Sequence, residues 1–187
     1  MIVPVTLILL GFAALIPLTY AQSNGVSTSN LTGGNWTTYT NEVIGISFDY
    51  PSGWGIKEKQ NRFDSVADVI ISDDTNHSQF RISKSEGPFT SDVGDSTRYA
   101  EKHFDEEDEL EIIESTDVKK YEIGGDKTAT FLAKSDEEDS QYGIQFIYVI
   151  HKENLYLLAF RDLTSTFDTP ASQSILNKFI QSFRFLS

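Results

Sequence analysis

The sequence predicts an α+β domain, built on a mainly antiparallel β-sheet whose faces are covered by helices. Short segments in which apolar and polar residues alternate follow one another along the chain, separated by turn-forming residues. Two neighbouring segments, residues 142–150 and 155–161, are apolar on both faces, as expected of central strands with other elements on each side. Residues 170–182 carry an apolar stripe at helical spacing, which predicts a helix lying on the sheet.

The first strands are predicted around residues 39–54. Residues 46–50 alternate and end in a Pro-Ser-Gly turn, so residues 54–59 are expected to fold back as the second arm of a β-hairpin. Residues 37–40 predict another strand before it, and Gly-Gly-Asp at residues 124–126 indicates a second tight turn. Further strands are expected at residues 66–72, 79–85, 110–115, 118–123, 127–134, 142–150 and 155–161.

Two helices are predicted. The first covers residues 96–107, with Asp95 or Ser96 as its N-cap. The second follows Thr169, a capping residue, and has Pro170 in its first turn, where the missing N–H costs no helical hydrogen bond.

Composition excludes several classes of function. The 187 residues suit one domain, and 28 acidic against 15 basic residues give a formal net charge of −13. Nucleic-acid binding is not expected, because phosphate contacts need clustered Lys and Arg. The charge also disfavours adsorption to anionic lipid and favours cationic partners or divalent ions. Because cysteine is absent, disulfides, thiolate nucleophiles and Cys-ligated metals are excluded.

Residues 1–21 are predicted to be a signal peptide, so we expect an exported, secreted or cell-surface protein. Residues 1–20 carry no charged side chain, and Thr19 and Ala21 are small residues where a signal peptidase requires them, before Gln22. The alternative is an uncleaved membrane anchor, because the apolar run is nearly long enough to span a bilayer. Residues 22–35 are polar and rich in Ser, Thr, Asn and Gly, which predicts a flexible tether before a domain at 36–187.

Three Asn-x-Ser/Thr sequons begin at Asn30, Asn35 and Asn76. Such sequons are acceptors for N-glycosylation in exported proteins. Two of them lie in or beside the predicted tether, where they would be accessible.

The order of these motifs resembles that of PsbP-like domains, the relatives of the extrinsic P subunit of photosystem II. WTTYTN at residues 36–41 and GISFDYPSGW at 45–54 resemble the start of the family, and IGGDKTA at 123–129 resembles its internal hairpin. LYLLAF at 155–160 and the helix that ends in IQSF at 180–183 resemble its end.

The resemblance implies an α/β/α sandwich and an exported, non-enzymatic binding or accessory role at the cell envelope. The expected partner is an envelope or extracellular protein, and the chain is expected to be a monomer. Photosynthesis is not implied, since similar domains occur in many exported proteins of non-photosynthetic microbes. Fold alone does not carry function across such a family.

No catalytic motif is present: the sequence has no Gly-x-Ser-x-Gly, Ser-x-x-Lys or His-Glu-x-x-His pattern. The histidines His77, His103 and His151 are far apart in the sequence. The alternative to a binding module is a hydrolase or metal-dependent enzyme whose Ser, His and carboxylate residues meet only in space. A histidine beside a Ser or a carboxylate in a cleft would favour that alternative.

The acidic run at residues 105–109 is a candidate for weak calcium binding. Asp105, Glu106, Asp108 and Glu109 follow the end of a predicted helix, where the helix dipole disfavours negative charge, and a divalent cation would relieve this repulsion. The run lacks the spacing of an EF-hand loop, and the alternative is a solvated acidic loop.

The aromatic residues Trp36, Tyr39, Tyr50 and Trp54 allow two interpretations. They could line a ligand groove, or they could close one end of the hydrophobic core, which is the commoner role of such residues.

Overall fold

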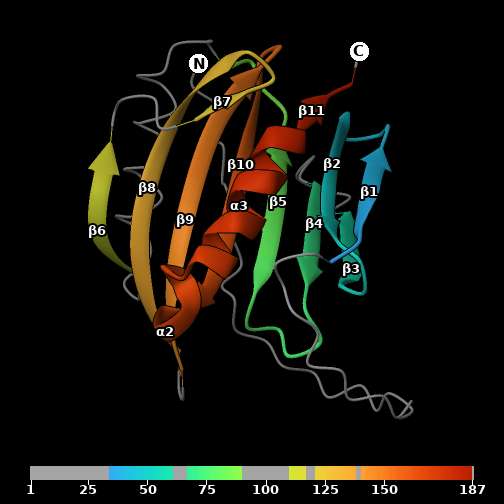
Figure 1. The fold of residues 1–187 in the computed structure, drawn as a ribbon. Helices are drawn as coiled ribbons and strands as arrows, with labels where there is room; N and C mark the ends of the chain where they lie inside the picture. The colour runs from blue at the N-terminus through green and yellow to red at the C-terminus, as the bar shows by residue number, and fades with distance from the viewer. Residues whose placement is uncertain (1–33, 61–66, 90–109, 117–120, 138–139, 187) are drawn as a thin grey trace. The chain divides into compact units, whose positions relative to one another are not determined.

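The computed structural model describes residues 34–60, 67–89, 110–116, 121–137 and 140–186, which all belong to one compact unit, Leu31–Ser187 (Figure 1). The strands are β1 (Trp36–Asn41), β2 (Ile46–Pro51), β3 (Gly55–Gln60), β4 (Ala67–Ser72), β5 (Gln79–Ser85), β6 (Leu110–Thr116), β7 (Glu122–Ile123), β8 (Asp126–Glu137), β9 (Ser140–His151), β10 (Asn154–Leu163) and β11 (Arg184–Phe185). The helices within these residues are α2 (Thr164–Phe167) and α3 (Pro170–Ser182).

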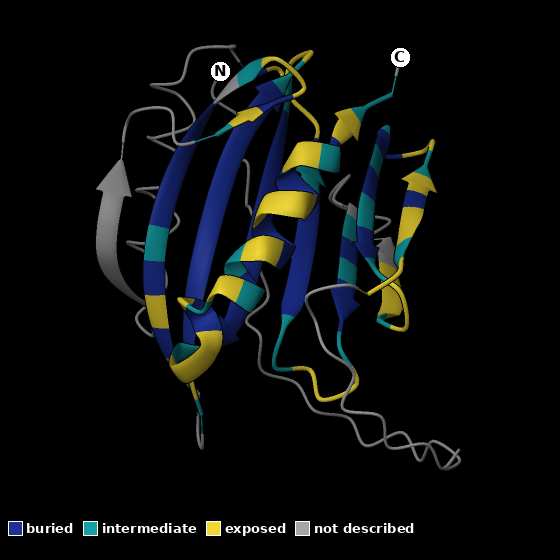
Figure 2. Cartoon of the chain, in the orientation of Figure 1, coloured by how far each residue is buried: buried dark blue, intermediate teal, exposed yellow. Residues whose placement is uncertain are grey.

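The larger of two sheets is antiparallel and has the strand order β3-β4-β5-β10-β9-β8-β6, with β7 paired to β8. This confirms the mainly antiparallel α+β class. Strands β9 and β10 lie in the interior of the sheet, and every residue from 142 to 150 and from 155 to 162 is buried, as the two-faced apolar pattern predicts (Figure 2).

The smaller sheet has the order β1-β2-β11 and corrects one prediction. The turn after β2 is present, since the Trp54 N–H donates to the Pro51 carbonyl at 3.2 Å. However, β3 does not fold back on β2 and pairs with β4 instead. The reason is that both edges of β2 are already occupied. β1 pairs with one edge, and β11 covers the other together with Ser182, whose Oγ accepts from the Asp49 N–H at 2.9 Å.

The hairpin that does form joins β1 to β2 through residues 42–45. The Asn41 Oδ1 accepts hydrogen bonds from the Val43 and Ile44 N–H groups at 3.0 and 3.1 Å, which makes an Asx-turn. Gly45 closes the loop with φ of 73°, a left-handed conformation that glycine adopts without steric cost.

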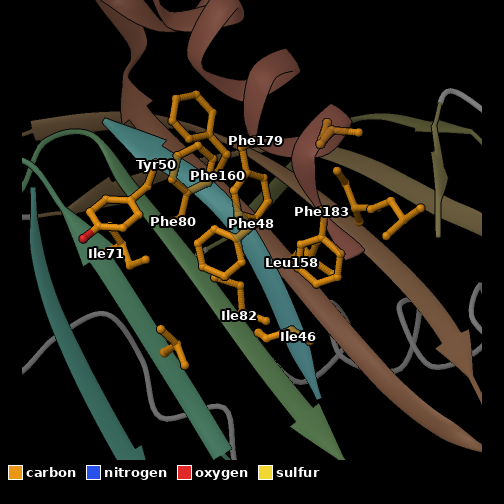
Figure 3. Packing of buried hydrophobic residues seen from close by; sticks show 14 of the residues in the cluster. Ile46, Phe48, Tyr50, Ile71, Phe80, Ile82, Leu158, Phe160, Phe179 and Phe183 are labelled. Atoms are coloured by element: carbon orange, nitrogen blue, oxygen red, sulfur yellow. The ribbon is translucent and has the colours of Figure 1, made fainter. Parts of the chain in front are cut away.

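Helix α3 joins the two sheets in one hydrophobic core. Thr169 caps the helix by accepting from the Ser172 N–H at 3.4 Å, as predicted. The Phe179 ring lies 4.9 Å from that of Phe48 in β2 and 4.1 Å from that of Phe80 in β5, between ring centroids. Figure 3 shows these rings together with Phe160 of β10, whose centroid is 4.8 Å from that of Phe80. The helix presents its exposed residues to solvent on the other side (Figure 2).

The described helices α2 and α3 both contribute buried side chains, Phe167 and Phe179 among them, to this core. The helix predicted at 96–107, which would form the second helical layer of a sandwich, lies outside the described residues, as do the predicted signal peptide and most of the tether. Among the described residues, no helix is both long enough and apolar enough to cross a membrane.

Replacing the central aromatic of α3 tests this packing. Phe179 is 1% exposed, so Phe179→Ala is expected to lower the free energy of unfolding by about 3–5 kcal/mol through lost burial and a residual cavity. Urea denaturation followed by circular dichroism measures the change. Asn177→Ala, at an exposed position of the same helix, is the control and is expected to change stability by less than about 0.5 kcal/mol. A loss below about 1 kcal/mol for Phe179→Ala would contradict the packing.

Candidate functional site

A groove of about 620 Å³ lies where the loop between β1 and β2 meets the turn between β9 and β10. Its residues come from four parts of the chain that are distant in sequence. It is lined by Thr40, Glu42, Val43, Ile44, Gly45, Lys84, His151, Lys152, Asn154, Tyr156 and Leu186. Its volume falls in the range of sites that hold small ligands or short chain segments.

Tyr156 fixes the floor of the groove. Its ring is buried, and its hydroxyl donates to the Ile44 carbonyl at 3.1 Å, which ties the loop 42–45 to β10. Burial, with a smaller effect of Glu86, raises the pKa of Tyr156, so the hydroxyl remains a hydrogen-bond donor at physiological pH. The C-terminal segment is attached to the same loop, since the Leu186 N–H donates to the Gly45 carbonyl at 2.8 Å.

His151 is held in one orientation at the side of the groove. Its Nδ1 lies 2.6 Å from the Asp126 Oδ2, and its ring stacks on Phe185 at 4.0 Å between centroids with an angle of 5° between planes. With Nδ1 donating to this carboxylate, Nε2 is the ring nitrogen that remains for another partner. The Phe185 ring packs against Gly124. A Cβ at residue 124 would lie 2.6 Å from this ring, so the absence of a side chain there makes room for it.

The turn between β9 and β10 holds two non-glycine residues in the left-handed conformation. Its two central residues, Lys152 and Glu153, have φ of 46° and 65°, although neither is glycine. Hairpin turns of this geometry favour Asn and Gly, and a non-glycine residue in the left-handed region costs about 1–3 kcal/mol. Such strain concentrates at binding sites, and here it fixes the position of Lys152 at the groove.

Two lysines, Lys84 and Lys152, line the groove. The Lys84 Nζ lies 6.0 Å from the centroid of the Tyr156 ring, in a cation–π arrangement. Neither Lys84 nor Lys152 has a carboxylate within ion-pair distance in the part of the chain that the structure describes. Among the described residues that line the groove, the one carboxylate belongs to Glu42, which is exposed.

The residues predicted to bind calcium, Asp105, Glu106, Asp108 and Glu109, lie outside the described residues, and their role stays a prediction. Within the residues that are described, no group of three or more His, Cys, Asp or Glu side chains could hold a metal ion.

The sequons and the other histidines are only partly described, and Asn30 and His103 lie outside the described residues. Asn35 is exposed immediately before β1, and Asn76 is exposed in the turn between β4 and β5. Asn76 has φ of 59°, and its Oδ1 accepts from the Ser72 hydroxyl at 2.8 Å. Both asparagines are therefore accessible, whereas His77 lies in the β4–β5 turn, away from the groove.

The four aromatic residues near β1 and β2 close the core. Tyr39 and Tyr50 are buried in the cluster, while Trp36 and Trp54 pack against it partly exposed. The Tyr39 hydroxyl donates to the Glu58 Oε1 at 2.7 Å, and burial together with this carboxylate raises the pKa of Tyr39 to about 12. The groove lies elsewhere, and these residues do not line it.

Sequence reasoning did not find the groove. The strands predicted at 142–150 and 155–161 imply a turn between them, but no turn was predicted for the loop 42–45 that forms the opposite wall. The available signal was the Asn41-x-x-x-Gly45 pattern, which predicts an Asx-turn closed by a left-handed glycine. No local pattern connects that loop to Lys84 or Tyr156.

Comparison with known proteins establishes the family. The family model for the PsbP-like protein matches residues 1–183, so the chain belongs to the PsbP-like protein family. Among proteins with curated descriptions, none matches this sequence.

Two solved structures with TM-scores above 0.5 show the same fold. Cyanobacterial PsbP (CyanoP) from Synechocystis sp. PCC 6803 is 16% identical, with a TM-score of 0.59 over 86% of this chain and 98% of that one. A protein from Bacteroides thetaiotaomicron VPI-5482 is 17% identical, with a TM-score of 0.51 over 80% of this chain and 48% of that chain. This chain therefore spans about half the length of the Bacteroides protein. LpqN from Mycobacterium tuberculosis, described as involved in cell envelope biogenesis, has 12% identity and a TM-score of 0.48, covering 83% and 88%.

Proposed function

We propose that this PsbP-like protein is an exported, non-catalytic accessory module of the cell envelope, which binds a protein partner in the groove beside Tyr156. Family membership supports an accessory role, because PsbP-like domains share a fold rather than a reaction. The observation that carries the proposal is the groove itself. Its walls are fixed by buried contacts, and its two lysines have no anionic partner within the described residues.

The groove is preformed rather than a gap between loose loops. The Tyr156 hydroxyl, the Leu186 N–H and the stack of Phe185 on His151 hold its walls in place. A rigid concave surface binds with a smaller loss of conformational entropy than a surface that must order on binding.

Obstructing the groove is expected to abolish partner binding. Val43 lines the groove and is 74% exposed, so Val43→Trp adds bulk at the groove without entering the core. Ile56, on β3 and 40% exposed, is the other large exposed apolar residue among those described, and Ile56→Trp is the matched control. Affinity capture from an extract of the cell envelope, read by mass spectrometry, should recover the same protein with wild type and Ile56→Trp but not with Val43→Trp. Equal recovery with Val43→Trp would contradict binding in the groove.

Export is the second part of the proposal, and it is supported by the uncharged apolar segment at residues 1–20 with Thr19 and Ala21 before Gln22. The mature protein is expected to begin at Gln22 and to be recovered outside the cytoplasm. N-terminal sequencing and intact mass of the native protein measure this. Full-length chain in the membrane fraction would show that residues 1–21 are an anchor, and full-length chain in the cytoplasm would contradict export.

A hydrolytic function is a second candidate, because the structure places His151 beside Asp126 at the groove. A histidine oriented by a carboxylate can act as a general base toward water. The described residues that line the groove include no serine. Of the two hydroxyls among them, that of Thr40 lies 3.1 Å from the Ser47 Oγ, and that of Tyr156 donates to the Ile44 carbonyl. Among the described residues, this groove offers no serine nucleophile for a covalent mechanism of the Ser-His-Asp kind, so the hydrolytic candidate relies on a His-activated water.

An ester-hydrolysis assay distinguishes the two functions. The binding module is expected to hydrolyse p-nitrophenyl esters no faster than a His151→Gln variant does. The enzyme would be favoured if wild type hydrolyses the ester at least about a hundredfold faster than His151→Gln while both capture the partner equally. General base catalysis contributes about 10²–10⁴-fold. His77→Gln, in the β4–β5 turn, controls for adventitious catalysis by an accessible imidazole.

A further inference from the structure

We propose that the groove binds the C-terminal carboxylate of a partner polypeptide whose last side chain is apolar. This inference rests on the proposed binding function and names the part of the partner that enters the groove. It follows from three properties of the groove: unpaired positive charge, an adjoining apolar wall, and a volume of about 620 Å³.

The charge of the groove contrasts with that of the protein. Elsewhere in the described residues, Arg81 pairs with Asp68 at 2.8 Å and Lys178 lies 3.6 Å from Asp49. The chain has 28 acidic residues against 15 basic ones, so carboxylates to neutralise a lysine are abundant. Lys84 and Lys152 nevertheless line one groove with no carboxylate partner among the residues that the structure describes. Two ammonium groups at one groove attract an anion, and charge-assisted hydrogen bonds to a carboxylate are about twice as strong as neutral ones.

The structure defines the position of the Lys84 side chain and of the Lys152 backbone. The Lys84 side chain extends over the Tyr156 ring, and Lys152 is set by the left-handed backbone of its turn. Positioned cations lose less side-chain entropy on binding than lysines on an open surface. An extended anionic surface is not required, because both lysines line a single groove.

The apolar part of the groove lies beside these charges. Val43 is 74% exposed, Ile44 is buried beneath the loop, and Leu186 is half-buried. Gly45 has no side chain, which leaves room against the Tyr156 hydroxyl. A C-terminal residue such as leucine carries a carboxylate and an apolar side chain on the same Cα. This matches a groove in which lysines lie beside apolar residues. Capture of a C-terminal carboxylate is a recurring mode of peptide recognition.

Glu42 limits the charge that the ligand can carry. Its carboxylate also lines the groove, so a second negative charge on the ligand would be repelled. The preferred ligand therefore carries one carboxylate at its end and neutral residues before it. A strongly acidic segment is expected to bind less well, although the lysines alone would favour it.

The test uses three probes on the mature domain at physiological salt: the peptide acetyl-Gly-Gly-Leu with a free carboxylate, the same peptide with a C-terminal amide, and N-acetyl-leucine. Binding is followed by NMR titration of the backbone amides. The free-acid peptide is expected to bind at least about tenfold more tightly than the amide and than N-acetyl-leucine, with the largest shifts in residues 42–45 and 151–156. A tenfold ratio corresponds to one charge-assisted contact.

Charge variants separate a site from general electrostatics. The pair Lys84→Gln and Lys152→Gln is expected to weaken the free-acid peptide at least about tenfold, to the level of the amide. The pair Lys57→Gln and Lys134→Gln, at exposed positions that do not line the groove, removes the same charge and is expected to change affinity less than about twofold. Glu42→Gln is expected to strengthen binding about two- to threefold. Circular dichroism confirms that each variant is folded.

Several outcomes would overturn the proposal. No measurable binding of the free-acid peptide, equal binding of the amide, or equal loss in both lysine pairs would each exclude carboxylate recognition at this groove. Equally tight N-acetyl-leucine would assign the groove to small organic acids rather than to a chain end. The two proposals can fail separately. If Val43→Trp abolishes partner capture but the peptide experiments give any of these results, the chain-end proposal fails and the binding function stands. If capture does not depend on Val43, the binding function itself fails.

Discussion

The packing of Phe179 between Phe48 and Phe80 is the interaction on which the rest of the structure depends. Phe48 belongs to the smaller sheet, Phe80 to the larger one and Phe179 to α3. The Phe179 ring centroid lies 4.9 Å from that of Phe48 and 4.1 Å from that of Phe80. A three-stranded sheet with one two-residue strand would bury little surface alone and would be marginally stable. Contact with the helix and the larger sheet gives it a shared core (Figure 3).

The groove is a consequence of this packing. One wall of the groove is the loop 42–45 of the smaller sheet, and the opposite wall is the turn 151–154 of the larger sheet. The shared core, the hydrogen bonds from Tyr156 to Ile44 and from Leu186 to Gly45, and the stack of Phe185 on His151 hold the two walls at a fixed separation. The aromatic side chains that determine the fold therefore also determine the shape of the candidate site, although none of the three phenylalanines lines it.

Much of the fold could be predicted because its signals are local. The two-faced apolar pattern located β9 and β10, and Thr169 with Pro170 located the start of α3. The expected hairpin between β2 and β3 was wrong because a turn sequence shows that the chain reverses, not which strands pair. Pairing was decided by β11, far along the chain, which takes the edge of β2 that β3 would have needed. The groove could not be predicted for the same reason, because Lys84, His151 and the loop 42–45 meet through tertiary contacts alone. The acidic run at residues 105–109 could be recognised from the sequence because it is a local feature.

Native-state hydrogen exchange on a Phe48→Ala variant tests most directly whether the two sheets form one cooperative unit. Phe48 is 1% exposed in the core. If the shared core holds both sheets together, the most protected amides of β9 and β10 should lose as much protection as those of β2, because all of them exchange through the same global opening. Loss of protection confined to β1 and β2, with β9 and β10 unchanged, would show that the smaller sheet opens independently and would contradict this account.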